Sequence, residues 1–362
     1  MESQPAPTTD WDPIVEQIRK QHLEGPPFFS RSMLQRVALQ IQLYNNGMLD
    51  GKPYMLETIK GDVIIIEAKP DVESEIFKDV RCNHGDRKQG PYIYYRTVQS
   101  MLSHQDMKKF HPEAAFLPLV VMFPKKPGRC LGHHHNHKEG EPNSSFSPTE
   151  LTNIINNDRQ AWESSLQYAF FKGILKMYQE RLVNVDKVIA FGCGNLSTGR
   201  TACDYSTAQH ALVFSIQKIL SRLHSKNITV HQGFRQIRNE EPVDLVVRAV
   251  LQDPAYTPVE EQVLTSMGME IVKDPDGFVL LDDKSFVVSI DLNTPVQQIM
   301  ENLARPIAII QMTHVDELNG AKVEACTDPS SERVDNMLRN EYELMKLTMP
   351  KQHRNICLYV RK

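Results

Sequence analysis

The sequence predicts an α/β protein built on a Rossmann-like, mostly parallel sheet with helices on both faces, preceded by an α+β N-terminal region. One observation is that residues 187–312 alternate short apolar strands with amphipathic helices, an order typical of parallel sheets with right-handed crossovers. The other is that the strand KVIAF, which starts at Lys187, leads directly into the turn Gly192-Cys193-Gly194. Open α/β sheets bind ligands at such turns, where backbone N–H groups are free.

Length, charge and cysteine content restrict the class of protein. The 362 residues suffice for one large or two ordinary domains. There are 41 basic and 45 acidic side chains, and the resulting formal charge of -4 disfavours nucleic acid as the main partner. The 6 cysteines form no C-x-x-C pair, as expected for reduced thiols.

The sequence predicts neither a membrane segment nor a secretory signal. Its apolar runs are far shorter than the roughly 20 residues that a membrane helix needs. The N-terminus lacks a basic region followed by an apolar run. We therefore expect a protein of the cytoplasm, with the nucleus as the alternative location.

The first third of the chain is expected to combine helices and strands. Residues 1–12 are polar and proline-bearing and are predicted to be mobile, and residues 13–123 form the α+β region. Two helical patterns follow Pro13, and the second ends at Asn45-Asn46-Gly47. Strand character, with β-branched and aromatic residues, appears at 62–69, 91–98 and 117–123.

Residues 124–147 have the composition of a linker, rich in proline, glycine, serine and histidine. They include the run CLGHHHNH from Cys130 to His137, whose imidazoles and thiol are zinc ligands by type. A flexible, glycine-flanked run usually does not hold such ligands together, so we predict a solvated loop that binds metal only adventitiously. A metal site that keeps its ion is the alternative.

A second domain is predicted over residues 148–362. Ser147 and Glu150 have the spacing of a capping box, with Pro148 at the first helical position. A long helical stretch follows, with a break expected near 156–158. Further strands are predicted at 188–191, 243–251, 286–290, 306–312 and 356–360, the last as an edge strand, and helices at 206–223, 258–267, 296–303 and 332–347.

The glycine turn resembles two kinds of cofactor site only in part. A full G-x-G-x-x-G needs a third glycine where Ser197 stands, and no acidic residue lies between Asp204 and Glu240 to bind a ribose. Classical NAD or FAD binding is therefore disfavoured. Asp253, 59 residues after Gly194, leaves an S-adenosylmethionine site open, because methyltransferases place an acidic residue at the end of the next strand.

Three residues near the predicted cleft carry reactive groups. Cys193 lies between two glycines at a predicted helix N-terminus, where thiolates are favoured, so it is either a reactive thiol or a packed one. His210 and His314 are either acid–base groups or ordinary histidines of a helix and a loop. With no base identifiable beside Cys193, the sequence assigns no catalytic residue.

Several motifs occur together in a fixed order. The strand turn Gly192-Cys193-Gly194-Asn195 precedes a helix containing Ser206-Thr207-Ala208-Gln209, and then a strand end Gln252-Asp253-Pro254-Ala255-Tyr256 followed by Glu260. As a set, over roughly residues 150–312, they resemble the Sensitivity to Red light Reduced (SRR-like domain) family in a fungal form. The resemblance implies a Rossmann-like fold and regulatory roles, in clock and light signalling in plants and in growth, cytoskeletal or haem-related processes elsewhere. It implies no settled reaction.

The resemblance carries family positions onto Gly192, Gly194, Ser206, Ala208, Gln209, Asp253 and Glu260. Many members have a Pro-His-Cys-like motif after a later strand, where this chain has Val288-Ser289-Ile290-Asp291-Leu292-Asn293. A role that needs that histidine or cysteine is in doubt here, and Asp291 or Asn293 could serve as polar groups at the same rim.

The predicted function is a regulatory or interaction role, with protein partners and a small-ligand cleft. The predicted ligand-binding residues are Gly192, Cys193, Gly194, Asn195, Gln209, Asp253 and Tyr256. The ligand is not identified by the sequence. The alternative is a Rossmann-type enzyme, methyltransferase-like or nucleotide-binding, in fungal specialised metabolism. A third hypothesis places partner specificity in the N-terminal region.

Overall fold

The computed structural model divides the chain into two compact units, Met1–His134 and His135–Lys362. It describes residues 10–49, 52–66, 91–107, 112–122, 146–196, 200–232, 246–290, 292, 294–312, 328–347 and 356–362, with the helical backbone alone at 200–204 and 226–232. The boundary between the units falls inside the predicted linker.

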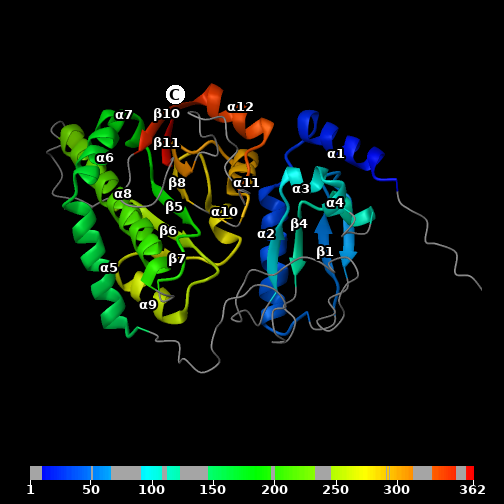
Figure 1. Cartoon of the computed structure of the whole chain (residues 1–362), viewed down its shortest axis with the longest axis horizontal. Coiled ribbons are helices and arrows are strands. Elements are labelled where there is room, and N and C mark those ends of the chain that lie inside the picture. The colour runs from blue at the N-terminus through cyan, green and yellow to red at the C-terminus, as the bar shows by residue number, and fades with distance from the viewer. Residues whose placement is uncertain are drawn as a thin grey trace, which may run out of the picture. The chain divides into compact units, whose positions relative to one another are not determined.

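The first unit contains helices and two small antiparallel sheets (Figure 1). Strand β1 pairs with β2, and β3 pairs with β4. The elements are α1 (Asp12–Glu24), α2 (Arg31–Asn45), β1 (Tyr54–Glu57), β2 (Val63–Ile66), β3 (Tyr92–Tyr95), α3 (Val98–Leu102), α4 (His104–Met107), a 3-10 helix (Pro112–Phe116) and β4 (Leu119–Met122).

The strand predicted at 91–98 ends earlier, at Tyr95, because Arg96 turns into the core and Thr97 is the N-cap of α3. Arg96 is fully buried, and its Nη1 donates to the carbonyl oxygens of Ala114, Ala115 and Leu117 at 3.1, 2.9 and 3.1 Å. Thr97 caps α3, since its Oγ1 accepts from the N–H of Ser100 at 2.9 Å. Strand β1 was not predicted, because a four-residue strand with methionine and glutamate carries a weak pattern.

The second unit is built around a seven-stranded sheet with the order β10-β11-β9-β8-β5-β6-β7 (Figure 1). Strands β7, β6, β5, β8 and β9 run parallel, while β11 is antiparallel to both β9 and β10. This confirms the mostly parallel sheet. The elements are α5 (Pro148–Glu163), α6 (Leu166–Met177), α7 (Gln179–Leu182), β5 (Lys187–Phe191), α8 (Arg200–Gln232), β6 (Arg248–Gln252), α9 (Pro258–Ser266), β7 (Glu270–Ile271), α10 (Asp276–Leu280), β8 (Ser285–Ser289), α11 (Val296–Leu303), β9 (Ala308–Met312), α12 (Glu332–Glu341), β10 (Tyr342–Leu347) and β11 (Ile356–Arg361).

Helices cover both faces of this sheet, as predicted (Figure 1). Along β5 the side chains alternate: Val188 and Ala190 join the hydrophobic core that α5, α6, α8 and α9 complete. Phe191 points to the other face, where its ring stacks on Phe278 of α10 with centroids 4.4 Å apart. The central strands β5 and β8 are therefore buried on both sides, which explains why they are mostly apolar.

The helical stretch after the linker begins as predicted but breaks elsewhere. The Ser147–Glu150 capping box is confirmed, with the Ser147 N–H donating to Glu150 Oε2 at 2.8 Å. The break predicted at 156–158 is wrong, because α5 continues to Glu163. The chain breaks where Ser165 can cap a new helix: its Oγ accepts from the Tyr168 N–H at 3.1 Å and starts α6.

The C-terminal prediction is wrong in part. Helix α12 ends at Glu341, and the rest of the predicted helix 332–347 forms β10. Strand β11 supplies the pairing partner, and the buried Tyr342 Oη donates to the carbonyl oxygen of Pro306 at 2.8 Å. Strand β11 is consequently not an edge strand, because it lies between β9 and β10.

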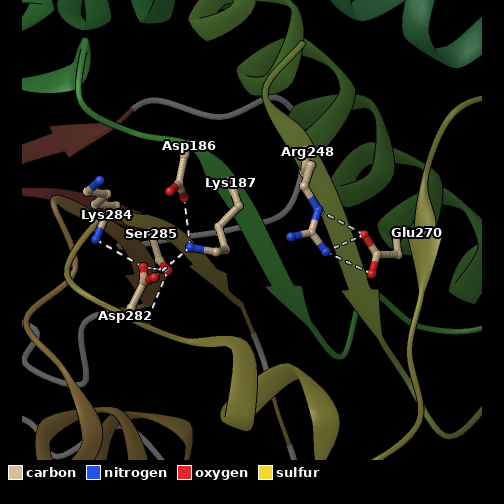
Figure 2. A network of polar contacts seen from close by, with 7 residues as sticks. All are labelled: Asp186, Lys187, Arg248, Glu270, Asp282, Lys284 and Ser285. Carbon is tan, nitrogen blue, oxygen red and sulfur yellow. Dashed lines mark hydrogen bonds and ion pairs between the residues drawn. The ribbon is translucent and has the colours of Figure 1, made fainter. Parts of the chain in front are cut away.

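Ion pairs hold the amino ends of the parallel strands (Figure 2). Lys187 Nζ, on a side chain only 9% exposed, lies 2.7 Å from Asp186 Oδ1 and 2.7 Å from Asp282 Oδ2. Arg248, at the start of β6, pairs with Glu270 of β7 at 2.7 Å. The opposite, carboxyl ends of the strands carry the residues that the sequence predicted to bind a ligand.

Candidate functional site

The structure brings the glycine turn and Asp253 together. Strands β5 and β6 are parallel neighbours, with Phe191 opposite Gln252, so the chain leaves both at the same edge. The Gly194 N–H donates to Asp253 Oδ2 at 2.6 Å. Asn195 Nδ2 donates to the carbonyl oxygen of Ala255 at 3.0 Å. Residues 59 positions apart thus form one rim.

Both glycines of the turn are required by backbone conformation. Gly192 has φ +61°, and a Cβ at this position would lie 1.7 Å from Leu292 Cδ2. Gly194 has φ +82°, and its Cβ would lie 3.3 Å from Ser206 Cβ. Residues other than glycine rarely adopt such φ values. Ser206 Oγ also donates to the carbonyl oxygen of Gly194 at 2.8 Å, which fixes α8 against the turn.

A second carboxylate, Glu260, completes the turn. It is fully buried; Oε1 accepts from the Leu196 N–H at 2.6 Å, and Oε2 accepts from the Thr257 N–H at 2.6 Å. Thr257 Oγ1 accepts in return from the Glu260 N–H, so the pair forms the capping box of α9. The sequence placed Glu260 in the family motif but not at the glycine turn. The T-P-V-E spacing signals its capping role, whereas its contact with Leu196 depends on the fold.

These contacts decide which ligands suit the turn. The N–H groups of Gly194 and Leu196 already bind carboxylates, whereas a phosphate cradle keeps such groups free. A phosphate here would also meet the negative charges of Asp253 and Glu260. Asp253 Oδ1 also accepts from the Ala255 N–H at 2.7 Å, so both carboxylate oxygens already accept one backbone N–H. A carboxylate oxygen can accept a second hydrogen bond, so the arrangement suits groups that donate, such as hydroxyls or amines.

Cys193, His210 and Tyr256 form a buried polar centre behind the turn. His210 Nδ1 lies 2.7 Å from the carbonyl oxygen of Ser206, which can only accept, so Nδ1 carries the proton. Its Nε2 therefore accepts from Tyr256 Oη at 2.8 Å.

Burial controls the protonation of all three groups. Burial lowers the pKa of His210 to about 4, although the contacts with Ser206 and Glu260 oppose this. Burial also raises the pKa of Cys193 and of Tyr256. Near pH 7 the imidazole, thiol and phenol are all neutral. This favours the packed thiol over the reactive one at Cys193.

Gln209 is the remaining predicted ligand-binding residue. Its side chain is 6% exposed, and Oε1 has no hydrogen-bond partner in the described part of the chain. A buried acceptor without a partner costs stability unless a donor reaches it. Gln209 is therefore a buried acceptor on α8, and no hydrogen bond between described residues joins it to the rim of Gly194 and Asp253.

A polar cluster that the sequence did not predict lies at the carboxyl ends of β8 and β9. The Gln297 N–H faces Asp328 Oδ1 and Oδ2 at 3.2 and 3.4 Å, and Gln311 Nε2 donates to Gln297 Oε1 at 3.1 Å. Burial raises the pKa of Asp328 to about 8, against the opposing contacts with Gln297 and Ser289. No sequence signal marked Asp328, since only the fold returns it to this edge.

Several predicted positions lie outside the described residues: His314, Asp291, Asn293 and the 130–137 run. Their roles stay predictions. Within the described ranges, no three histidine, cysteine or acidic side chains gather as metal ligands. Nor does any described helix have the length and apolarity to cross a membrane.

One pocket, of about 240 Å³, lies between α5 and α9, where Thr149, Gln262 and Ser266 contribute to its lining. It contains none of the predicted ligand-binding residues, and no charged side chain of the described residues lines it.

Comparisons with known proteins agree with the motif set. A search of curated proteins gave no match. The family model described as SRR1 domain matches residues 158–352, more than half of the chain, and the matched segment includes every predicted ligand-binding residue. The fungal form stays a prediction, whereas the resemblance to the family is thus confirmed: the chain belongs to the SRR1 domain family.

Proposed function

We propose that this chain is a regulatory or interaction protein, and that the rim formed by Gly192, Gly194 and Asp253 binds a small ligand that modulates it. The burial of Cys193, His210 and Tyr256 carries this proposal. A general base or nucleophile must reach its substrate, and these three side chains are enclosed by the protein. Burial also raises the pKa of the Cys193 thiol, so the thiol stays protonated near pH 7. The site therefore supports binding better than turnover.

The proposed ligand donates hydrogen bonds. Asp253 and Asn195 are half-exposed at the rim, while Gln209 Oε1 offers a buried acceptor. A ribose diol or an amine suits these acceptors, and a phosphate does not. Protein partners and a cytoplasmic or nuclear location belong to the same proposal, and a fungal origin stays a prediction.

The alternative function, an enzyme resembling S-adenosylmethionine-dependent methyltransferases, has one specific observation in its favour. Numbered along the chain, the parallel strands have the order 3-2-1-4-5, and doubly wound sheets of this order bind nucleotide ligands where the strand order reverses. Asp253 also ends the strand next to the glycine turn. A shared fold does not establish a shared reaction.

A ligand panel tests the proposal on the full chain. Native mass spectrometry and thermal shift would measure binding of S-adenosylmethionine, NAD(P), nucleosides, nucleotides, haem and zinc. Asp253→Asn removes one of the acceptors at the rim. Asp282→Asn is the matched control, because it makes the same change at the amino ends of the strands (Figure 2).

The expected result is a ligand with a free diol or amine that raises Tm in the parent and in Asp282→Asn, but much less in Asp253→Asn. The ligand should be recovered unchanged. Release of S-adenosylhomocysteine with methylation of an added acceptor would establish the alternative. If no member of the panel binds, and no protein partner depends on Asp253, the proposed cleft is wrong.

A further inference from the structure

Helix α6 exposes an apolar stripe on the side that faces away from the core. The stripe consists of Leu166, Phe170 and Met177, which are 87%, 54% and 72% exposed, with the exposed Ala169 and Gly173 between them. Their spacing along the helix places them on one face. The stripe is about 16 Å long, at about 1.5 Å per residue.

The opposite side of α6 is also apolar. Tyr168, Phe171, Ile174 and Leu175 are buried in the core, where Trp162 contacts the rings of Tyr168 and Phe171. Apart from Gln167, Lys172 and Lys176 on its flanks, α6 is apolar, and a helix that is apolar all round is normally buried. One side of α6 is buried in the core of the second unit, whereas the stripe on the other side is exposed.

Gly173 is not required by the chain itself. It lies in the interior of α6, and a Cβ built there would meet nothing within 4 Å. Glycine weakens a helix interior relative to alanine, so the fold alone favours alanine here. Together with Ala169 one turn earlier, it leaves a flat path on which a second helix backbone could approach closely.

Two lysines mark one flank of the stripe. Lys172 and Lys176 are exposed and lie one turn apart on α6. A second copy of the chain offers these lysines no acidic partner. If two α6 helices packed antiparallel about a two-fold axis, the lysine flanks of the two copies would lie side by side and repel each other. If they packed parallel, the lysines would face the uncharged Gln167 of the other copy. Acidic side chains on a partner helix would match them.

We propose that the α6 stripe docks an amphipathic helix of a partner protein, whose apolar side chains cover Leu166, Phe170 and Met177 and whose acidic flank faces Lys172 and Lys176. Close approach at Gly173 distinguishes this mode from insertion into a lipid surface, which gains nothing from a missing side chain. The surface is separate from the glycine turn and does not depend on the proposed ligand.

The test uses the full chain and two synthetic 20-residue peptides, each an amphipathic helix with a leucine stripe. One carries glutamates on its flank and the other carries lysines at the same positions. Fluorescence anisotropy of labelled peptide measures Kd. The parent protein should bind the acidic peptide at least about tenfold more tightly than the basic one, a difference of about 1.4 kcal/mol.

Four variants sharpen the test. Phe170→Gln should raise the Kd of the acidic peptide at least about tenfold. Leu344→Gln, which changes another exposed apolar residue of the same unit, should leave this Kd unchanged. The double variant Lys172→Glu/Lys176→Glu should reverse the preference between the peptides. Gly173→Ala should raise Tm by about 2–4 °C yet weaken binding severalfold, a combination that a purely structural role would not give.

Three results would overturn the proposal. If the parent binds both peptides equally, or if the parent and Phe170→Gln bind the acidic peptide equally, the α6 stripe is not the docking surface. A dimer in light scattering that Phe170→Gln dissociates assigns the stripe to a second copy of the chain. Co-sedimentation with phosphatidylserine-containing vesicles that Phe170→Gln abolishes, without peptide binding, assigns it to a membrane surface.

Discussion

Replacing Glu260 with glutamine tests whether the carboxylate holds the glycine turn. Each oxygen of this buried side chain accepts one backbone N–H, from Leu196 and Thr257, both at 2.6 Å. Glutamine has the same shape, but its amide nitrogen cannot accept, so one of the two N–H groups loses its partner. A buried donor without a partner costs about 1–3 kcal/mol. We expect the free energy of unfolding of the second unit to fall by about 2 kcal/mol.

Urea unfolding followed by tryptophan fluorescence measures this change. Trp162 lies in the core of the second unit, so a Trp11→Phe background leaves a signal from that unit alone. For a slope of roughly 2 kcal/mol per molar urea, the midpoint should fall by about 1 M.

Glu261→Gln is the matched control. The neighbouring Glu261 pairs with Lys273, whose side chain is 76% exposed, and such surface pairs contribute about 0–1 kcal/mol. If Glu260→Gln and Glu261→Gln unfold at the same urea concentration, Glu260 does not hold the turn, and the reasoning about the occupied N–H groups fails with it.

Three further predictions concern stability. In chemical denaturation, Gly192→Ala should lower the free energy of unfolding by about 2–4 kcal/mol, and Gly268→Ala by only about 1 kcal/mol. Both glycines have positive φ, but only at Gly192 would the added Cβ meet a close neighbour. Equal losses would contradict this reasoning. Lys187→Met should cost about 2 kcal/mol and Arg248→Met less than about 1 kcal/mol, since only the lysine is buried; the reverse order would refute the buried role. In the folded state the pKa of Asp328 is raised from 3.8 to about 8, so the folded state keeps a proton that the unfolded state has lost. The free energy of unfolding should therefore fall by up to roughly 3 kcal/mol between about pH 5 and about pH 7.5. Asp328→Asn should remove this pH dependence, and an unchanged pH dependence would contradict the assignment.

Much of the second unit follows from local patterns in the sequence. The Ser147–Glu150 capping box, the apolar strand from Lys187 and helix α11 lie where their patterns predict them. Such signals depend on residues close together in the chain. The order of strands and helices then implies a parallel sheet, because right-handed crossovers leave few other arrangements.

The sequence was less informative where partners far along the chain compete with local preference. Residues 342–347 were predicted as helix and form β10, since pairing with β11 outweighs their helical character. The break predicted at 156–158 failed for the opposite reason: asparagines are tolerated within α5, and Ser165 offers a better start for the next helix.

The sequence by itself determined the family, the fold class and the motif residues of the glycine turn, because these depend on ordered local patterns. Only the tertiary structure decided what those residues contact. It set Asp253 and Glu260 on the N–H groups that the sequence left free, and it buried Cys193, His210 and Tyr256 in neutral form. It also left one side of α6 exposed. Hydrogen bonding and burial depend on which distant segments meet, and that follows from the packed sheet rather than from spacing along the chain.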